Sequence, residues 1–135
     1  MHTSAARALA LRTDGVTYPG SVEHASTVRA DLRALLRDCP VADDVILCAS
    51  ELAANAARHS DSRFSGGTFI VRVTVSPGHR AIRVEVEDQG GPWIGAPDES
   101  TGHHGLDILR TLAKEWGIDG DHAARTVWAR FDWSE

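Results

Sequence analysis

Residues 51–59 read Glu-Leu-Ala-Ala-Asn-Ala-Ala-Arg-His, and their spacing predicts an amphipathic helix. Glu51, Asn55 and His59 are four residues apart, which makes them neighbours on one stripe of a helix. At about 100° per residue, the apolar and small residues of this region fall together on the other side. They are Val45, Ile46, Ala49, Leu52, Ala53 and Ala56. One face is therefore suited to burial, while the other holds an acid, an amide and an imidazole.

The polar stripe carries chemistry that suits a magnesium-dependent phosphate site. The side-chain carbonyl of Asn55 is a hard oxygen ligand of the kind that Mg²⁺ prefers. Glu51, one turn earlier, can orient or deprotonate a hydroxyl group. The same pattern also fits a plain amphipathic helix whose polar face is only solvated, and the segment alone leaves both interpretations open.

Three segments further along the chain have patterns that suit a nucleotide site. Residues 83–91 alternate Val with charged residues and then reach Asp88 and two glycines, which predicts a half-buried strand ending where backbone can approach a ligand. Residues 102–109, Gly-His-His-Gly-Leu-Asp-Ile-Leu, predict a loop that leads into a helix. The free N–H groups and the dipole of such a helix start favour phosphate. Residues 125–131 predict a last strand with Thr126 at its start.

Together, these four segments resemble the conserved boxes of the histidine-kinase-like ATPase superfamily, which has the Bergerat ATP-binding fold. Within it, the chain is most similar to small bacterial anti-sigma-factor serine/threonine kinases, over about residues 18–131. The matching residues are Glu51, Asn55 and His59 on the helix, Asp88, Gln89 and Gly90 at the strand end, Gly102, Gly105 and Leu106 at the next helix start, and Thr126. One box alone is weak evidence, but four boxes in this order are specific together.

The resemblance implies a fold and a set of roles. The expected fold is an α/β (α+β) two-layer sandwich, with a mixed, mostly antiparallel sheet and three helices on one face. Asn55 would ligate the Mg²⁺ that bridges the phosphates of ATP, and Glu51 would act as general base on a substrate serine. Asp88 would pair with the exocyclic amine of adenine, because an ionised carboxylate only accepts hydrogen bonds. Thr126 and a water molecule would complete that contact.

The remaining expected nucleotide contacts come from glycines and histidines. They are His59, Gly90, Gly91, Gly102, His103, His104, Gly105 and Leu106. One departure from the family pattern is that no Lys or Arg lies between Gln89 and Leu109. His103 and His104 are therefore candidates for the missing countercharge, although they also fit exposed loop histidines. This departure bears on the rate of phosphoryl transfer more than on nucleotide binding.

The bulk composition limits the other possibilities. A chain of 135 residues is enough for one domain; we expect an N-terminal arm at residues 1–16, possibly partly disordered, and the ATP-binding domain at 17–135. A net charge of −5 without blocks of like charge argues against a direct nucleic-acid partner. No run approaches the roughly 20 apolar residues of a membrane span, so we expect no membrane partner and a cytoplasmic location. Cys39 and Cys48 lack metal-site spacing.

Local signals predict the order of helices and strands. Ser21 or Ser26 could cap a first helix that ends at Cys39-Pro40, because the residue before proline leaves the helical region. Pro77-Gly78-His79 predicts a hairpin turn. The other expected elements are a short strand at 17–18, helices at about 41–60 and 104–114, and strands at 68–76, 80–88, 116–119 and 126–133.

The resemblance thus predicts an ATP- and Mg²⁺-dependent serine/threonine kinase in transcription regulation, which phosphorylates an anti-sigma antagonist protein and binds a sigma factor, possibly as a homodimer. The alternative is a nucleotide-dependent protein-binding module with little or no kinase activity, which the missing lid cation favours. A two-component histidine kinase is not expected, since no phosphoacceptor hairpin precedes Tyr18. A DNA-acting ATPase would need a further domain.

Overall fold

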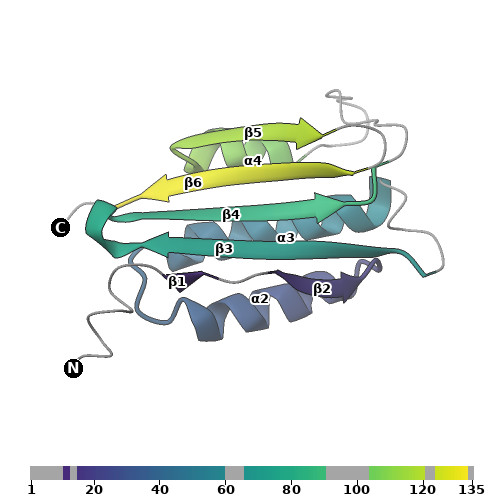
Figure 1. Cartoon of the computed structure of the whole chain (residues 1–135), viewed down its shortest axis with the longest axis horizontal. Coiled ribbons are helices and arrows are strands. Elements are labelled where there is room, and N and C mark those ends of the chain that lie inside the picture. Colours follow the sequence, from purple (N-terminus) through teal and green to yellow (C-terminus); the bar gives the residue numbers. More distant parts are fainter. Residues whose placement is uncertain (1–10, 13–14, 60–65, 91–103, 121–123, 134–135) are drawn as a thin grey trace.

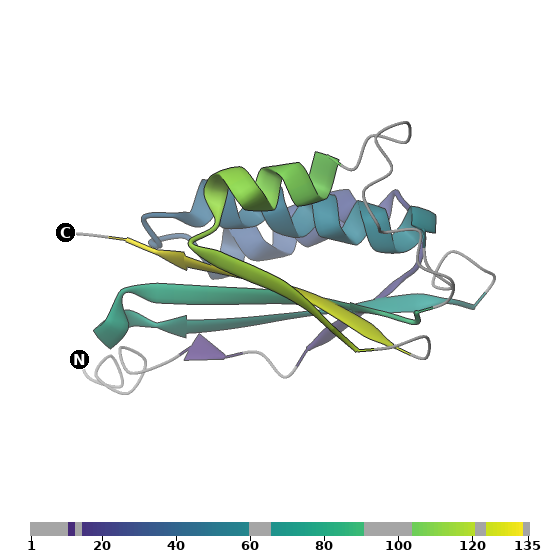
Figure 2. The same cartoon turned by 90° about the horizontal axis from the view of Figure 1, so that it is seen from above.

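The chain folds into two layers, with three helices packed on one face of a single sheet (Figures 1 and 2). The computed structural model describes residues 11–12, 15–59, 66–90, 104–120 and 124–133. The helices are α2 (His24–Leu35), α3 (Ala42–His59) and α4 (His104–Leu112). Helix α3 lies between the other two and contacts both of them as well as the sheet. The predicted α+β sandwich is therefore confirmed.

The sheet has the strand order β1-β3-β4-β6-β5, and β2 also pairs with β3. The strands are β1 (Leu11–Arg12), β2 (Val16–Pro19), β3 (Thr68–Ser76), β4 (Ala81–Asp88), β5 (Glu115–Gly120) and β6 (Arg125–Asp132). Every pairing between these strands is antiparallel, so the described sheet is not mixed. Leu11 pairs with Val75 and Arg12 with Thr74, so ordered pairing begins inside the segment that was predicted to be an arm.

Strict alternation along the three long strands separates the core from the open face of the sheet. The patterns of β3 and β4 alternate residue by residue between half-buried and buried positions, and β6 does so up to Phe131. Successive side chains in a strand point to opposite faces, so the buried set faces the helices. The largest fully buried side chains include Phe69, Ile82 and Phe131 from the sheet and Val45 from α3.

Helix α3 is buried on more of its surface than an isolated amphipathic helix, because it has a helix on each side. The six small and apolar residues predicted for its inner face are all buried, and so are Cys48, Ser50, Ala54 and Ala57. Leu47, Glu51 and Asn55 lie on one stripe, four residues apart, and remain half-buried or exposed. The predicted polar stripe is therefore the part of α3 that stays open.

The first helix differs from its prediction at both ends. Neither Ser21 nor Ser26 caps it: Glu23 holds the N-cap position without a side-chain cap bond, and the Ser21 hydroxyl lies 2.7 Å from Nδ1 of His24. Helix α2 ends at Leu35, and a separate turn, in which the Cys39 N–H donates to the Leu36 carbonyl, follows before proline. The predicted run to Cys39 was wrong because proline only marks the latest possible end of the helix.

The hairpin between β3 and β4 is confirmed and has a short 3-10 turn at Pro77–His79. Arg80 follows this turn with a φ of 49°. The pairing of Ser76 with Ala81 closes the hairpin. The third helix and the last two strands lie within a few residues of their predicted bounds.

Candidate functional site

Four elements of the candidate site face one end of the molecule. The end of β4, the start of β6 and the C-terminal end of α3 lie toward the right of Figure 1, and the N-terminal end of α4 faces the same side in Figures 1 and 2. Segments that are far apart in sequence are thus brought together. The site predicted from four separate boxes is spatially possible in this fold.

Asn55 and Glu51 lie on the stretch of α3 that approaches this end. Asn55 is one turn before the last residue of α3, and Glu51 is one turn earlier. Both side chains are half-buried, so they are held by the helix yet open on one side. An amide oxygen and a carboxylate are therefore presented in the order that the sequence predicted.

Asp88 is a buried carboxylate at the end of β4. Its residue is only 6% exposed, and its position in the alternation directs it toward the helical layer. Oδ1 of Asp88 accepts a hydrogen bond from the N–H of Gly90 at 2.7 Å. Gly90 has a φ of 74°, in the left-handed region, where glycine is favoured because a Cβ atom would be strained. The turn after Asp88 therefore depends on glycine and on the carboxylate itself.

Arg125, at the start of β6, is the residue that the sequence analysis missed. It is directly opposite Asp88 in the antiparallel register and is equally buried. Its Nε lies 3.5 Å from Oδ1 of Asp88, and its Nη2 donates to the carbonyl of Gly90 at 3.0 Å. One guanidinium thus contacts both the side chain and the main chain of the Asp88–Gly90 turn.

A signal for Arg125 was present in the sequence. The inward positions of β6 after it are the apolar residues Val127, Ala129 and Phe131. A charged residue in that series must be buried, and a buried cation needs an anionic partner. Finding the partner required the strand register, which sequence does not give.

The acid–base balance at Asp88 reflects opposing effects. Burial raises the pKa of the Asp88 carboxyl above its ordinary value, while the Gly90 N–H and the Arg125 guanidinium lower it, and Glu87 adds a smaller increase. A raised pKa in the folded state means that the carboxyl destabilises the fold as pH rises above the ordinary Asp value. Arg125 and Gly90 therefore offset part of the cost of keeping this buried group ionised.

The structure does not support the contact predicted for Thr126. The register pairs Thr126 with Glu87, whereas Asp88 is opposite Arg125. Because side chains alternate, Thr126 points to the open face of the sheet, away from the inward-facing Asp88. The predicted contact of Thr126 with adenine, through a water molecule, stays a prediction.

The other predicted nucleotide contacts are only partly described. Gly91, Gly102 and His103 lie outside the described residues. His59 is the last residue of α3, and His104, Gly105 and Leu106 form the first turn of α4, so their backbones are placed but their side chains are not described. The start of α4 thus lies at the predicted helix N-terminus.

A shallow groove separates α3 from α4 next to the polar stripe. It has a volume of about 540 Å³ and is lined by Leu47, Asp107, Ile108, Thr111 and Leu112. Leu47 is 43% exposed and belongs to the same stripe of α3 as Glu51 and Asn55. The groove and the polar stripe are therefore continuous along one side of α3.

Two arginines lie on the helices near this site, Arg110 on α4 and Arg58 on α3. Arg110 lies 3.9 Å from Asp107 and has its guanidinium 5.9 Å from the centre of the Trp116 ring. Arg58 is exposed on α3. Among the described residues, no group of three His, Cys, Asp or Glu side chains could hold a metal ion. Asn55 thus stands without a cluster of further protein ligands in that part of the chain.

The two cysteines are free thiols. Cys48 is fully buried in α3, and burial, with smaller effects of Asp44 and Glu51, raises its pKa to about 12. A thiol with this pKa stays protonated near neutral pH, and the thiolate is the reactive form. Cys48 therefore serves as core packing.

The fold and the site define an ATPase-type α+β domain. The chain belongs to the Histidine kinase-like ATPase domain family, which it matches over residues 18–131. The fold is also similar to a crystal structure of the RsbU and RsbW domains of Rv1364c from Mycobacterium tuberculosis, with a TM-score of 0.67 and 20% sequence identity. The similarity covers 91% of this chain and 31% of that one, so this chain spans about a third of the larger protein.

A search of curated protein sequences finds no match. Membership in the ATPase family implies ATP binding. No helix in the described part of the chain is both long and apolar enough to cross a membrane.

Proposed function

We propose that this domain binds Mg-ATP and transfers the γ-phosphoryl group to a serine or threonine of a partner protein. The observation that carries the proposal is the buried Asp88 carboxylate at a strand end, next to the glycine turn and at the same end of the molecule as the Asn55 stripe. An ionised carboxylate accepts from the amine of adenine and repels the carbonyl of guanine. The site therefore favours adenine nucleotides.

The residues on α3 fit the magnesium that the family implies. Mg²⁺ keeps several water ligands and commonly takes one or two protein oxygens in addition to substrate phosphates. The amide oxygen of Asn55, on the open stripe of α3, is compatible with this coordination. When bound, the ion would neutralise charge on the phosphates. Asn55 would hold the ion, and the start of α4 would supply N–H groups to phosphate oxygens.

Glu51 would take the proton from the attacking hydroxyl. It lies one turn from Asn55 on the same stripe and is half-buried, so its carboxylate is close to where phosphates would be held and still accessible to a partner protein. Phosphoryl transfer depends mainly on positioning and charge stabilisation. One base on a rigid helix is therefore a sufficient catalytic group. His104, the first residue of α4, and His103, the residue before it in the sequence, would add countercharge.

We further propose a regulatory setting like that of anti-sigma-factor kinases. The phosphoryl acceptor would be a small anti-sigma antagonist protein, the second partner a sigma factor, and the compartment the cytoplasm. The fold similarity to a structure that includes an RsbW domain supports this setting. The groove between α3 and α4 is lined by Leu47, one helical turn before Glu51, and a protein substrate could approach Glu51 from this side.

A second function is favoured by one observation. The sequence has no Lys or Arg between Gln89 and Leu109, where a cation would hold the γ-phosphate. The domain would then bind a partner protein in a nucleotide-dependent way with little or no transfer. Incubation with γ-labelled ATP, Mg²⁺ and candidate antagonist proteins separates the two functions. Label on a partner serine or threonine supports the kinase, whereas nucleotide-dependent partner binding without label supports the binding module.

A further inference from the structure

We infer that Arg125 is a positioning residue for nucleobase selectivity, which holds the Asp88 carboxylate and the Gly90 carbonyl in the arrangement that favours adenine over guanine. The inference rests on the proposed nucleotide site and deepens it. Arg125 would not touch the phosphates or the reacting atoms. It would act through Asp88.

Three contacts tie this turn into one closed unit. The Gly90 N–H donates to Oδ1 of Asp88, Nη2 of Arg125 donates to the Gly90 carbonyl, and Nε of Arg125 lies 3.5 Å from the same Oδ1. Both main-chain polar groups of Gly90 are therefore engaged, one by the acid and one by the guanidinium. The carboxylate cannot rotate without losing at least one of these contacts.

A guanidinium is better suited than an ammonium to this position. Arginine presents several N–H donors in a rigid plane, so two different atoms of one side chain can contact the carboxylate and the carbonyl at once. A lysine has a single nitrogen on a flexible stem and would have to divide it between the two acceptors. The side chain of Arg125 is 7% exposed, so water cannot readily replace what is lost.

The charge of Arg125 also affects which nucleobase Asp88 can recognise, because it affects the protonation of the Asp88 carboxyl. A buried carboxylate without a nearby cation takes up a proton more easily, and a protonated carboxyl can donate a hydrogen bond as well as accept one. Such a group would no longer reject the carbonyl of guanine. Of the neighbouring charges, Glu87 would strengthen this change, because it is an anion, although it is paired with Arg72 at 2.8 Å on the open face.

The test compares three variants by calorimetric titration with Mg-ATP and Mg-GTP. Arg125→Met removes the guanidinium but keeps an apolar side chain. Arg125→Lys keeps the positive charge but loses the planar set of N–H donors. Arg130→Met is the matched control on the same strand, because Arg130 also makes ion pairs, with Glu115 and Asp132, but at the far end of β6. Thermal melting of each variant shows whether it is folded.

We expect Arg125→Met to lower the ATP-to-GTP affinity ratio about tenfold, which is the usual effect of losing a charged hydrogen-bonding partner. Arg125→Lys should recover part of the ratio, and Arg130→Met should match the parent. If Arg125→Met does not fold, Arg125→Lys alone should still show a reduced ratio.

Three results would overturn the inference. The first is an unchanged ratio of ATP to GTP affinity in both Arg125 variants. The second is an equal loss of ATP and GTP affinity, which would indicate a purely structural role. The third is tighter ATP binding, which would mean that Arg125 competes with adenine for Asp88. If the parent protein prefers ATP and the Arg125 variants keep the same preference, only this inference is wrong. A parent that binds neither nucleotide defeats the proposed function as well.

Discussion

At the scale of single residues, the site depends on a buried carboxyl group, Asp88, whose pKa is raised by burial and lowered in part by Gly90 and Arg125. An isolated buried charge is costly, and proteins usually neutralise or pair such groups. Asp88 has a cation, Arg125, and a main-chain donor, Gly90, within reach of the same oxygen. A buried ion pair is weak evidence of stabilisation, because desolvation can exceed the Coulombic gain. Its position at a strand end is better explained by recognition.

Replacing Asp88 by Asn should reduce adenine selectivity, because an amide offers donors as well as an acceptor. We expect ATP affinity to fall about tenfold or more, with a smaller change for GTP. Glu87→Gln is the control, since Glu87 is the preceding residue but pairs with Arg72 on the open face. Calorimetry that gives the same ATP-to-GTP ratio for Asp88→Asn and the parent would remove Asp88 from base recognition.

Replacing Glu51 by Gln should separate phosphoryl transfer from nucleotide binding. The amide keeps the size of the side chain but cannot accept a proton, so we expect transfer to slow by about 10²–10⁴-fold. Nucleotide affinity should change little, because Glu51 is not proposed to hold phosphate or metal. Rates from labelled ATP, together with affinities from calorimetry, check both parts. Full activity in the variant would show that Glu51 is not the base.

At the scale of elements, α3 combines a core function with a site function. Its small residues allow it to pack closely between α2, α4 and the sheet, while the stripe with Leu47, Glu51 and Asn55 stays open. A helix fixed on several sides is a rigid support, and sites on rigid elements hold their geometry better than sites on loops. Changes on the open stripe should therefore affect binding without opening a cavity.

Asn55→Ala should abolish Mg²⁺-dependent nucleotide binding while the fold stays intact. Alanine has a higher helix propensity than asparagine, and Asn55 is only half-buried, so the melting temperature should not fall. Asp43→Ala, at the exposed far end of α3, is the control and should bind Mg-ATP as the parent does. A variant that unfolds, or that binds Mg-ATP as tightly as the parent, would show that Asn55 is not the metal ligand.

Among the described side chains of α4, Leu109 is the buried one, and we expect it to hold the helix against α3 and the sheet. Leu109 is fully buried, so Leu109→Ala should cost about 2–5 kcal/mol of the free energy of unfolding. Thr111→Ala, on the exposed side of the same helix, should change it by less than about 0.5 kcal/mol. Urea denaturation measures both values. Equal stability of the two variants would contradict the packing described here.

The elements also show where sequence patterns are sufficient and where they are not. The alternation of Val and charged residues in β4 and the spacing of α3 determine which side chains are buried, so both were predictable. The pairing of Asp88 with Arg125 depends on strand register, and no local pattern specifies which residues of two distant strands face each other. The end of α2 was misplaced because several residues before Pro40 could have ended it.

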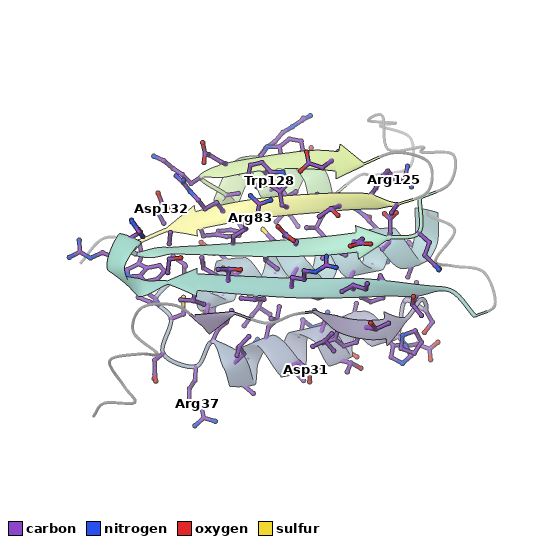
Figure 3. All side chains as sticks on the ribbon, viewed as in Figure 1. Asp31, Arg37, Arg83, Arg125, Trp128 and Asp132 are labelled. Atoms are coloured by element: carbon purple, nitrogen blue, oxygen red, sulfur yellow. The ribbon has the colours of Figure 1, made fainter. Side chains whose placement is uncertain are left out.

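At the scale of the whole molecule, the fold puts all three helices on one side of the sheet and leaves the other side open (Figure 2). The open face carries paired charges and aromatic contacts, such as the Arg83–Glu85 ion pair at 2.7 Å and the Arg83 guanidinium over the Trp128 ring at 4.3 Å (Figure 3). The candidate site lies instead at one end of the helical layer. We propose this end, where β4 ends at Asp88, as the place where the nucleotide binds.

The central claim is that this end of the molecule reads adenine, and calorimetric titration of the full chain tests it most directly. Mg-ATP and Mg-GTP are titrated under identical conditions, and the ATP titration is repeated with EDTA in place of Mg²⁺. The account predicts measurable ATP binding that is at least about tenfold tighter than GTP binding and that weakens without the metal. Equal affinity for the two nucleotides, or no binding of either, would contradict it.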